Sequence, residues 1–439
     1  MTLPPFAALE SALSGLSVAR PAGRVARLSG GLAEVTGLGG AARIGDLVEI
    51  RAGRGGARQG EVLALSEGGV SVLPDGGCAG LGTGDAAVLI GEVTLAPDDA
   101  WLGRVIDPMG APLDGRPLPP GSRARALRAD PPPAGARRGL GARLATGLSA
   151  FDTLLPIVRG QRLGLFAGSG VGKTRLLGQF ATGIEADVVV LALIGERGRE
   201  LGEFLREVLG AAGLARSVVV AATADRSPAM RRRAAWSAMT VAEHFRDSGR
   251  QVLLLADSVT RFAEAHREIA LAGGEPAALR GHPPSTLGLV TELAERAGPG
   301  AGGQGDITAI LSVLVAGSDM EEPVADILRG ALDGHVVLDR RIAEGGRFPA
   351  VDVLRSVSRS LPAAAGPEEN RLIGEARRLI GVHAEAEVMI QSGLYTAGSD
   401  RAIDAAIAVR GGLEAFLAAP APDGPSDSFA RLETALAPA

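Results

Sequence analysis

The chain has 439 residues, 46% of them hydrophobic, and a formal net charge of −5 at neutral pH. This length predicts two or three domains rather than one compact core. The negative net charge argues against general nucleic-acid binding, which needs an excess of basic residues. The apolar runs are far shorter than the ~18 residues that predict a membrane span. With Cys78 as the single cysteine and no signal-peptide pattern at the start, we expect a cytoplasmic protein without disulfides.

Residues 1–20 are expected to form an amphipathic helix. Phe6, Leu9, Leu13 and Leu16 recur at helical steps of three and four residues, which predicts an apolar stripe along one face. The pattern alone leaves two interpretations open, because the stripe can pack on its own domain or dock a partner protein.

The next stretch, residues 24–93, is expected to form a small all-β barrel or sandwich. Short β-type runs alternate there with glycine-rich turns, which is typical of such domains. The runs are Leu32 to Val35, Leu47 to Ile50, Glu61 to Leu65, Val70 to Leu73 and Ala86 to Ile90.

Residues 117–143 are expected to form an extended strap or linker. The stretch contains a run of three prolines, and it holds six arginines against one acidic residue, Asp130. Proline-rich segments of this kind favour extended backbone. The positive charge is interpreted as a solvated face rather than a binding patch.

Beyond the strap, strand-like apolar runs alternate with helical segments, which is the signature of a parallel α/β sheet. Ser227 followed by Pro228 marks the start of one of these helices. From Pro367 onward the pattern becomes helical and predicts a C-terminal helical domain. The predicted strands are Leu163 to Ala167, Val188 to Ile194, Ser217 to Ala222, Val252 to Ala256, Ile307 to Val315 and His335 to Leu338.

The first of these strands leads into a phosphate-binding loop. Lys173 is the only lysine among 45 basic residues, and its compact ammonium fits a ring of backbone N–H groups better than a planar guanidinium does. Glycines let the backbone turn its N–H groups toward phosphate, and the helix that follows adds its positive end. The alanine at position 167 departs from the strict pattern, which has glycine there. The loop consists of Ala167, Gly168, Ser169, Gly170, Val171, Gly172, Lys173 and Thr174.

Two acidic residues follow later strands of the predicted sheet. Asp257 ends the apolar run that starts at Val252 and is the candidate for holding Mg²⁺ together with Thr174. Glu196 follows the run that starts at Val188 and is the candidate base that orients and deprotonates water. Glu200 and Glu203 are rivals, but they lie further into the next helix, where a solvated face explains them better.

Several further blocks make the chain similar to the superfamily of rotary ATP synthases and type III secretion ATPases. Within that superfamily the chain most closely resembles the flagellar export ATPases, and the resemblance covers nearly its whole length. The superfamily blocks are 167–174, 195–200, 257–262, 267–270, 283–285 and 356–359. The blocks that resemble the secretion branch are 274–276, 320–326, 332–335, 346–350 and 394–400.

This resemblance implies an N-terminal β-barrel, a RecA-like ATPase core and a C-terminal helical domain, divided as 1–20, 21–95, 96–365 and 366–439. It implies Mg²⁺-dependent ATP hydrolysis by a homohexameric ring, with Lys173, Glu196 and Arg359 catalytic. Arg359 would be the arginine finger supplied by a neighbouring subunit. Composition alone cannot identify this residue, because the chain contains so many arginines.

The same resemblance implies partners. Residues 1–20 would dock an export regulator or stator protein, and the ring would meet export gate and stalk proteins, export substrates and their chaperones. It would bind no nucleic acid and would lie at the inner face of the cytoplasmic membrane.

The chain also departs from its relatives. Gly345 stands where they carry arginine, Ala316 and Ser318 replace acidic residues, and no aromatic residue can be named for the purine ring. An injectisome ATPase remains an alternative, and a hexameric RNA translocase is a more distant one. A catalytic subunit of a rotary synthase would carry an acidic motif in its C-terminal helices, and residues 371–393 show no such acidic run. A subunit that binds nucleotide without turnover would lack Glu196.

Overall fold

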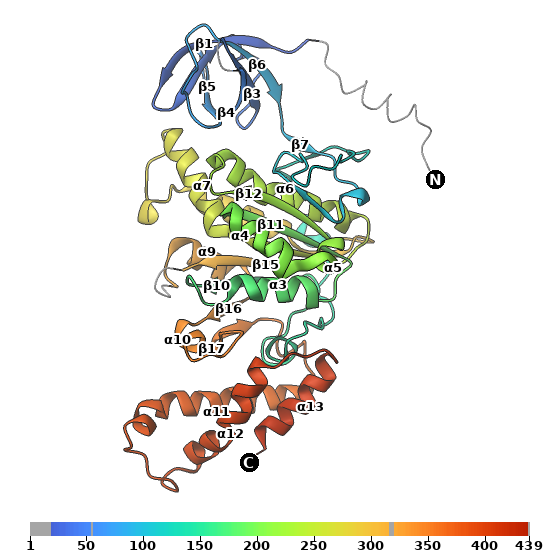
Figure 1. The fold of residues 1–439 in the computed structure, drawn as a ribbon, viewed down its shortest axis with the longest axis vertical. Coiled ribbons are helices and arrows are strands. Elements are labelled where there is room, and N and C mark those ends of the chain that lie inside the picture. The colour runs from blue at the N-terminus through green and yellow to red at the C-terminus, as the bar shows by residue number, and fades with distance from the viewer. Residues whose placement is uncertain (1–18, 54–55, 316–319, 438–439) are drawn as a thin grey trace.

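The computed structural model describes residues 19–53, 56–315 and 320–437. A barrel, a central α/β core and a helical C-terminal part follow one another along the longest axis of the molecule (Figure 1). This order confirms the predicted fold class. The predicted N-terminal helix, with Phe6, Leu9, Leu13 and Leu16, lies outside the described residues apart from its last two positions.

The barrel is closed, with the strand order β1-β2-β5-β4-β3-β6. Of the two architectures that the sequence left open, the barrel is therefore the one formed. The strand β1 was not predicted, because Val25 is the only one of its eight residues that is buried. The strands are β1 (Ala22–Ser29), β2 (Leu32–Thr36), β3 (Leu47–Ala52), β4 (Gly56–Ser66), β5 (Gly69–Pro74) and β6 (Ala86–Gly91).

The core contains a nine-stranded sheet in the order β17-β16-β10-β15-β13-β11-β12-β8, with β14 paired to β15. All six predicted strands are present and run parallel. The short β8 and the antiparallel β17 were not predicted. The strands are β8 (Arg104–Ile106), β10 (Arg162–Ala167), β11 (Val188–Glu196), β12 (Ser217–Thr223), β13 (Val252–Asp257), β14 (Gly298–Pro299), β15 (Asp306–Leu314), β16 (Gly334–Leu338) and β17 (Val351–Ser358).

Helices cover both faces of this sheet because its strands are apolar on both sides. Alternate residues of β11 enter two separate cores: Val189 and Leu191 pack on the side of α3, whereas Val188 and Val190 pack on the side of α6. The core helices are α2 (Ser149–Asp152), α3 (Lys173–Gly183), α4 (Gly198–Glu203), the π-helix η3 (Phe204–Leu209), α5 (Gly210–Ala215), α6 (Pro228–Asp247), α7 (Val259–Ala272), α8 (Ser285–Arg296), α9 (Pro323–Ala331) and α10 (Arg340–Glu344).

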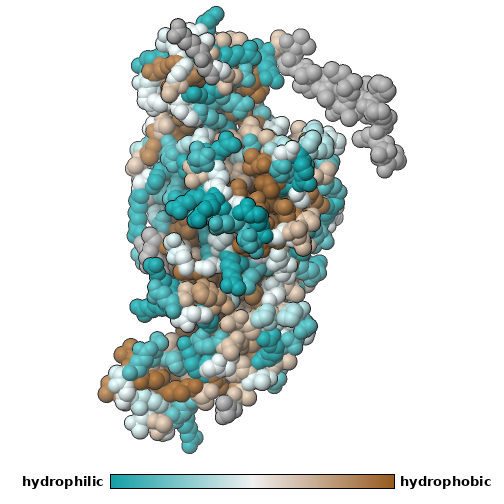
Figure 2. All heavy atoms as spheres, in the orientation of Figure 1, coloured by the Kyte–Doolittle hydropathy of each residue, from teal (hydrophilic) through white to brown (hydrophobic). Residues whose placement is uncertain are grey.

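The C-terminal part consists of the helices α11 (Pro367–Gln391), α12 (Arg401–Ala418) and α13 (Pro425–Leu436). It joins the core through α2, where Phe151 is fully buried and meets Phe180 of α3 edge to face, with ring centroids 4.9 Å apart. At the far end of this part, hydrophobic atoms reach the surface (Figure 2). Val388, in the last turn of α11, and Leu394, in the segment after it, are 79% and 78% exposed.

The strap, residues 117–143, is extended as predicted, with only the two-residue strand β9 (Arg125–Ala126) and the short 3₁₀ helix η2 (Ala134–Ala136) in it. Its charge forms only in part the solvated face that the sequence suggested, because Arg123, Arg128 and Arg138 are exposed whereas the other three arginines are half-buried. Five of its six arginines pair with acidic residues of the core or of α11: Arg125 with Asp247, Arg128 with Glu292, Arg137 with Glu295, Arg138 with Asp306 and Arg143 with Glu369.

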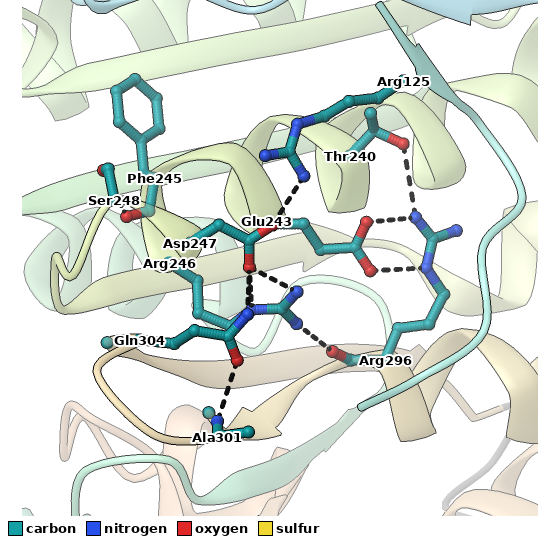
Figure 3. Close-up of polar contacts among 12 residues, drawn as sticks. Arg125, Thr240, Glu243, Phe245, Arg246, Asp247, Ser248, Arg296, Ala301 and Gln304 are labelled. Atoms are coloured by element: carbon teal, nitrogen blue, oxygen red, sulfur yellow. Dashed lines mark hydrogen bonds and ion pairs between the residues drawn. The ribbon is translucent and has the colours of Figure 1, made fainter. Parts of the chain in front are cut away.

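One buried arginine, Arg296, links the strap to the core. Arg296 of α8 has 1% of its side chain exposed and contacts both carboxylate oxygens of Glu243 at 2.9 and 2.7 Å. Its guanidinium also donates to the carbonyl oxygen of Leu127 in the strap at 2.7 Å. Figure 3 shows this pair beside the contacts of Arg246 and Asp247. The strap is therefore fixed to α6 and α8.

Candidate nucleotide site

The glycine-rich loop joins β10 to α3 in the context that a phosphate loop requires. Gly170 and Gly172 have φ values of +79° and +86°, which L side chains rarely adopt. Gly172 is the N-cap of α3 and has no side chain that could cap the first N–H groups of the helix. The first N–H groups of α3 therefore keep their hydrogen-bonding capacity, and the positive end of the helix dipole adds to it.

Lys173 and Asp257 meet at the edge where the parallel strands end. The Lys173 ammonium forms an ion pair with Oδ1 of Asp257, and only 8% and 3% of these residues are exposed. The Ser312 hydroxyl donates to the same oxygen at 2.7 Å. Ser312 lies in β15, between β10, which leads into the loop before Lys173, and β13, which ends in Asp257. The sequence did not point to it, since Ser312 and Thr308 are both polar residues inside a mostly apolar run.

Glu196 ends β11, the strand beside Asp257. In the parallel pairing of β11 with β13, Leu193 lies opposite Asp257, so that the two carboxylates share one edge of the sheet. Burial raises the pKa of Glu196 to about 7, and the charge of Asp257 adds to this rise while Lys173 opposes it. A carboxylate with a pKa in this range is matched to proton transfer at neutral pH.

Glu196 has an acidic and a basic side chain nearby. A hydrogen bond and the negative charge of Glu200 also raise the pKa of Glu196. Arg261 also lies near this end of β11, because its side chain would be 3.3 Å from a Cβ atom at Gly195 and the charge of Glu196 helps to raise the pKa of Arg261. Thr174, next to Lys173 in the first turn of α3, is exposed. The structure therefore brings Lys173, Thr174, Glu196 and Asp257 to one end of the sheet.

Arg359 lies at the opposite end of the sheet. It follows β17, which runs antiparallel to β16 with Val351 opposite Leu338 and Ser358 opposite Gly334. Gly334 and Leu338 are four steps apart along β16, so Ser358 lies roughly 13 Å from the edge where β16 ends. The exposed Arg359 donates to the carbonyl oxygen of Arg329 at 3.2 Å. Within one chain it is not brought together with Lys173.

An aromatic side chain that the sequence did not identify lies beside the loop. Phe348 is 41% exposed, and its ring would be 3.1 Å from a Cβ atom at Gly172. It lines a cavity of about 270 Å³, whose wall consists of Leu148, Gly172, Arg175, Leu176, Gln179, Phe348, Pro349, Ala418 and Pro420. Phe348 lies within the segment 346–350, which the sequence had already singled out. Its cavity could not be predicted because Ala418 and Pro420, from the C-terminal part, form one of its walls.

Two departures noted in the sequence can be located in part. Gly345 ends α10 and is followed by Gly346 at a φ of +82°, so this stretch is a tight turn. Ala316 and Ser318 lie outside the described residues. Among the helices of the described ranges, none is long and apolar enough to cross a membrane.

Comparisons with known families and proteins agree along the chain. The ATP synthase alpha/beta family, nucleotide-binding domain, matches residues 147–358, and the T3SS EscN ATPase C-terminal domain matches residues 365–428. A protein named flagellum-specific ATP synthase from Caulobacter vibrioides is 43% identical, over 93% of this chain and 94% of its own length. A protein named type 3 secretion system ATPase from Xanthomonas euvesicatoria is 41% identical, over 94% of this chain and 93% of its own length.

Two solved structures agree as well. The assembled ATPase EscN of the enteropathogenic E. coli type III secretion system is 38% identical, with a TM-score of 0.87, and the match covers 94% of this chain and 100% of that one. EscN in complex with its central stalk EscO gives a TM-score of 0.85 with the same identity and coverage. Fold and site together thus define a P-loop nucleotide-binding protein with a RecA-like core. More narrowly, the chain belongs to the family of flagellum-specific ATP synthases and type III secretion ATPases.

Proposed function

We propose that this chain hydrolyses ATP with Mg²⁺ and that the hydrolysis energises export of flagellar proteins through a type III secretion apparatus. The observation that carries the proposal is the meeting of Lys173, Glu196 and Asp257 at one end of the sheet, with the pKa of Glu196 raised to about 7. Phosphoryl transfer needs positioning and electrostatic stabilisation more than covalent chemistry, and these residues supply both.

In this proposal the backbone of residues 167–172 cradles the phosphates and Lys173 contacts the β and γ phosphates. Glu196, half-buried at the end of β11, orients a water molecule and accepts its proton. The nucleobase of ATP packs against Phe348 in the cavity beside Gly172, because the face of an aromatic ring can stack on any nucleobase.

The donor set at the site fits Mg²⁺. Among the described residues no group of three or more His, Cys, Asp or Glu side chains surrounds a potential metal position. Mg²⁺ in nucleotide enzymes is held by one or two protein oxygens together with phosphate and water. Thr174 and Asp257 would hold it here, and the bound ion would neutralise charge on the phosphates.

The position of Arg359 supports a site that two subunits complete. Because Arg359 lies far from Lys173 of its own chain, it would act as the arginine finger of the neighbouring subunit and stabilise the charge of the transferred phosphoryl group. A homohexameric ring satisfies this requirement at every interface. The assembled EscN structure, similar to this chain over 94% of its length, supports self-association.

Parts outside the core would contact the export machine. Residues 1–20 would dock the regulator or stator protein. The exposed Val388 of α11 and Leu394 just after this helix offer an apolar surface for stalk, substrates or chaperones. The complex of EscN with its stalk EscO supports a stalk partner. The ring would lie at the cytoplasmic membrane beside the export gate.

Copurification of the tagged chain from its native cell, joined to an ATPase assay of the eluate, tests this function. We expect flagellar stator, stalk and gate proteins together with Mg²⁺-dependent ATP hydrolysis. Recovery of injectisome components instead would assign the alternative machine. Absence of hydrolysis in the presence of all partners would refute the proposed activity.

A further inference from the structure

The cavity proposed for the nucleobase has walls from two parts of the chain. Phe348 and Pro349 come from the core, while Ala418 is the last residue of α12 and Pro420 follows it. A ligand that fills this cavity therefore touches the core and the C-terminal part together. What fixes the two walls relative to each other then determines the shape of the cavity.

Arg347, the residue before Phe348, is attached to α12. Its Nε lies 2.6 Å from Oε2 of Glu414, and 12% of the Arg347 side chain and 31% of the Glu414 side chain are exposed. Its Nη2 also donates to the carbonyl oxygen of Val351 at 2.9 Å. Glu414 precedes Ala418 by four residues, so both lie on the same face of α12. The ion pair thus ties one wall of the cavity to the other.

A second attachment lies just past the end of α12. The Ser149 N–H donates to the carbonyl oxygen of Ala419 at 3.2 Å, and the Ala421 N–H donates to that of Gly147 at 2.9 Å. Leu148, between these residues, bridges to Pro420 and lines the same cavity. The last turn of α12 is held on both sides of Ala418, by backbone bonds on one side and by Arg347 on the other.

The surroundings of Arg347 make this ion pair demanding. Burial lowers the pKa of Arg347, as does the charge of Arg410, whereas Glu414 and Asp352 raise it. Its Nη1 is buried without a hydrogen-bond partner among the described residues. A buried charge that loses its partner is strongly unfavourable, so Arg347 holds to Glu414 in one geometry. Arg410 shares Glu414 at 2.8 Å but is 39% exposed.

We propose that Arg347 is a positioning residue whose ion pair with Glu414 couples occupancy of the nucleobase cavity to the position of α12. The inference rests on the proposed function, in which this cavity takes the base of ATP. A base seated on Phe348 would hold α12 in place through Arg347 and Ala418. A partner that displaces α12 would weaken nucleotide binding, and by linkage bound nucleotide would weaken the binding of that partner by the same factor.

Calorimetry with two ligands tests the coupling. ADP carries a base, whereas inorganic tripolyphosphate occupies only the phosphate loop. In Arg347→Ala we expect ADP to bind about fivefold more weakly or worse, with unchanged binding of tripolyphosphate. Arg410→Ala is the matched control, because it removes the other arginine on Glu414, and it should leave both affinities unchanged. The charge swap Arg347→Glu with Glu414→Arg should restore part of the ADP affinity.

Hydrogen exchange of α12 gives a second readout that mere loss of stability would not reproduce. In the wild type, ADP should slow exchange in residues 401–418 and tripolyphosphate should not; in Arg347→Ala the ADP effect should vanish. If Arg347→Ala fails to fold, Glu414→Gln, which keeps the shape, serves for the same measurements. Equal loss of both ligands, or unchanged ADP affinity, overturns the coupling. A wild type that binds neither ligand would instead refute the proposed function.

Discussion

Lys173 forms a buried ion pair with Asp257, 84 residues further along the chain. The pair exists because β10, β15 and β13 lie side by side and in parallel, so that the loop after one strand and the carboxylate at the end of another share an edge. A lysine in this pair already faces an anion. In the proposed function a phosphate would compete with Asp257 for the same ammonium.

The first prediction concerns Lys173→Arg, which keeps the charge but widens the cationic group. Only 8% of Lys173 is exposed, so a planar guanidinium would displace the loop. We expect ATP hydrolysis to fall at least about 100-fold with little change in melting temperature. Lys173→Ala serves as the reference for complete loss. Normal turnover in Lys173→Arg would disprove the requirement for a compact ammonium.

The second prediction is that Glu196→Gln binds ADP normally but hydrolyses ATP about 10²- to 10⁴-fold more slowly. The amide preserves the size of the side chain and removes the proton acceptor. Calorimetry and a phosphate-release assay measure the two properties separately. Near-normal turnover would exclude Glu196 as the base.

The third prediction follows from the raised pKa of Glu196, about 7. The active form of a base is the carboxylate, so kcat/KM should fall as the pH drops through 7. Glu200→Gln removes a neighbour that raises this pKa, and the falling limb should therefore move to lower pH. A limb unmoved by Glu200→Gln would assign it to another group.

The parts of the fold that the sequence predicted are those with strong local patterns. The six parallel strands are continuous apolar runs, and their burial on both faces is what such runs indicate. The strand β17 was not predicted because Leu354, Arg355 and Val357 are exposed. The strand β8 was not predicted because three residues are too few to show a periodic pattern of hydrophobic residues. Boundaries and edge strands depend on tertiary pairing, which a single sequence does not contain.

The site shows the same division. Lys173, Glu196 and Asp257 were predictable because each ends a strand or begins a helix, and parallel strand ends meet at one edge. Ser312 was not, since only the register of β15 brings its hydroxyl to Asp257. The cavity at Phe348 also depends on Ala418, 70 positions away in the printed sequence.

The fourth prediction concerns Glu243, the carboxylate partner of Arg296. Glu243→Ala would leave a guanidinium buried and unpaired, which costs about 3–5 kcal/mol in the free energy of unfolding. Urea denaturation measures this loss. The double variant with Arg296→Met removes the unpaired charge, so it should recover part of the stability. A loss below about 1 kcal/mol in Glu243→Ala would mean that water or another group satisfies Arg296.

The fifth prediction tests the place of Arg359 at the far end of the sheet. Arg359→Ala should reduce turnover about 10³-fold or more while the ring still assembles, as sedimentation can show. The exposed Arg340→Ala, with 74% of its side chain accessible, is the control and should hydrolyse ATP normally.

Mixing inactive subunits then distinguishes action within a chain from action across an interface. Arg359→Ala subunits keep an intact phosphate loop, whereas Lys173→Ala subunits keep an intact finger. In randomly mixed rings one interface in four joins the two intact halves, so turnover should recover to about a quarter of the wild-type rate. Rings that mix, as mass measurement shows, yet remain inactive would place the finger elsewhere and remove the interface from the catalytic site.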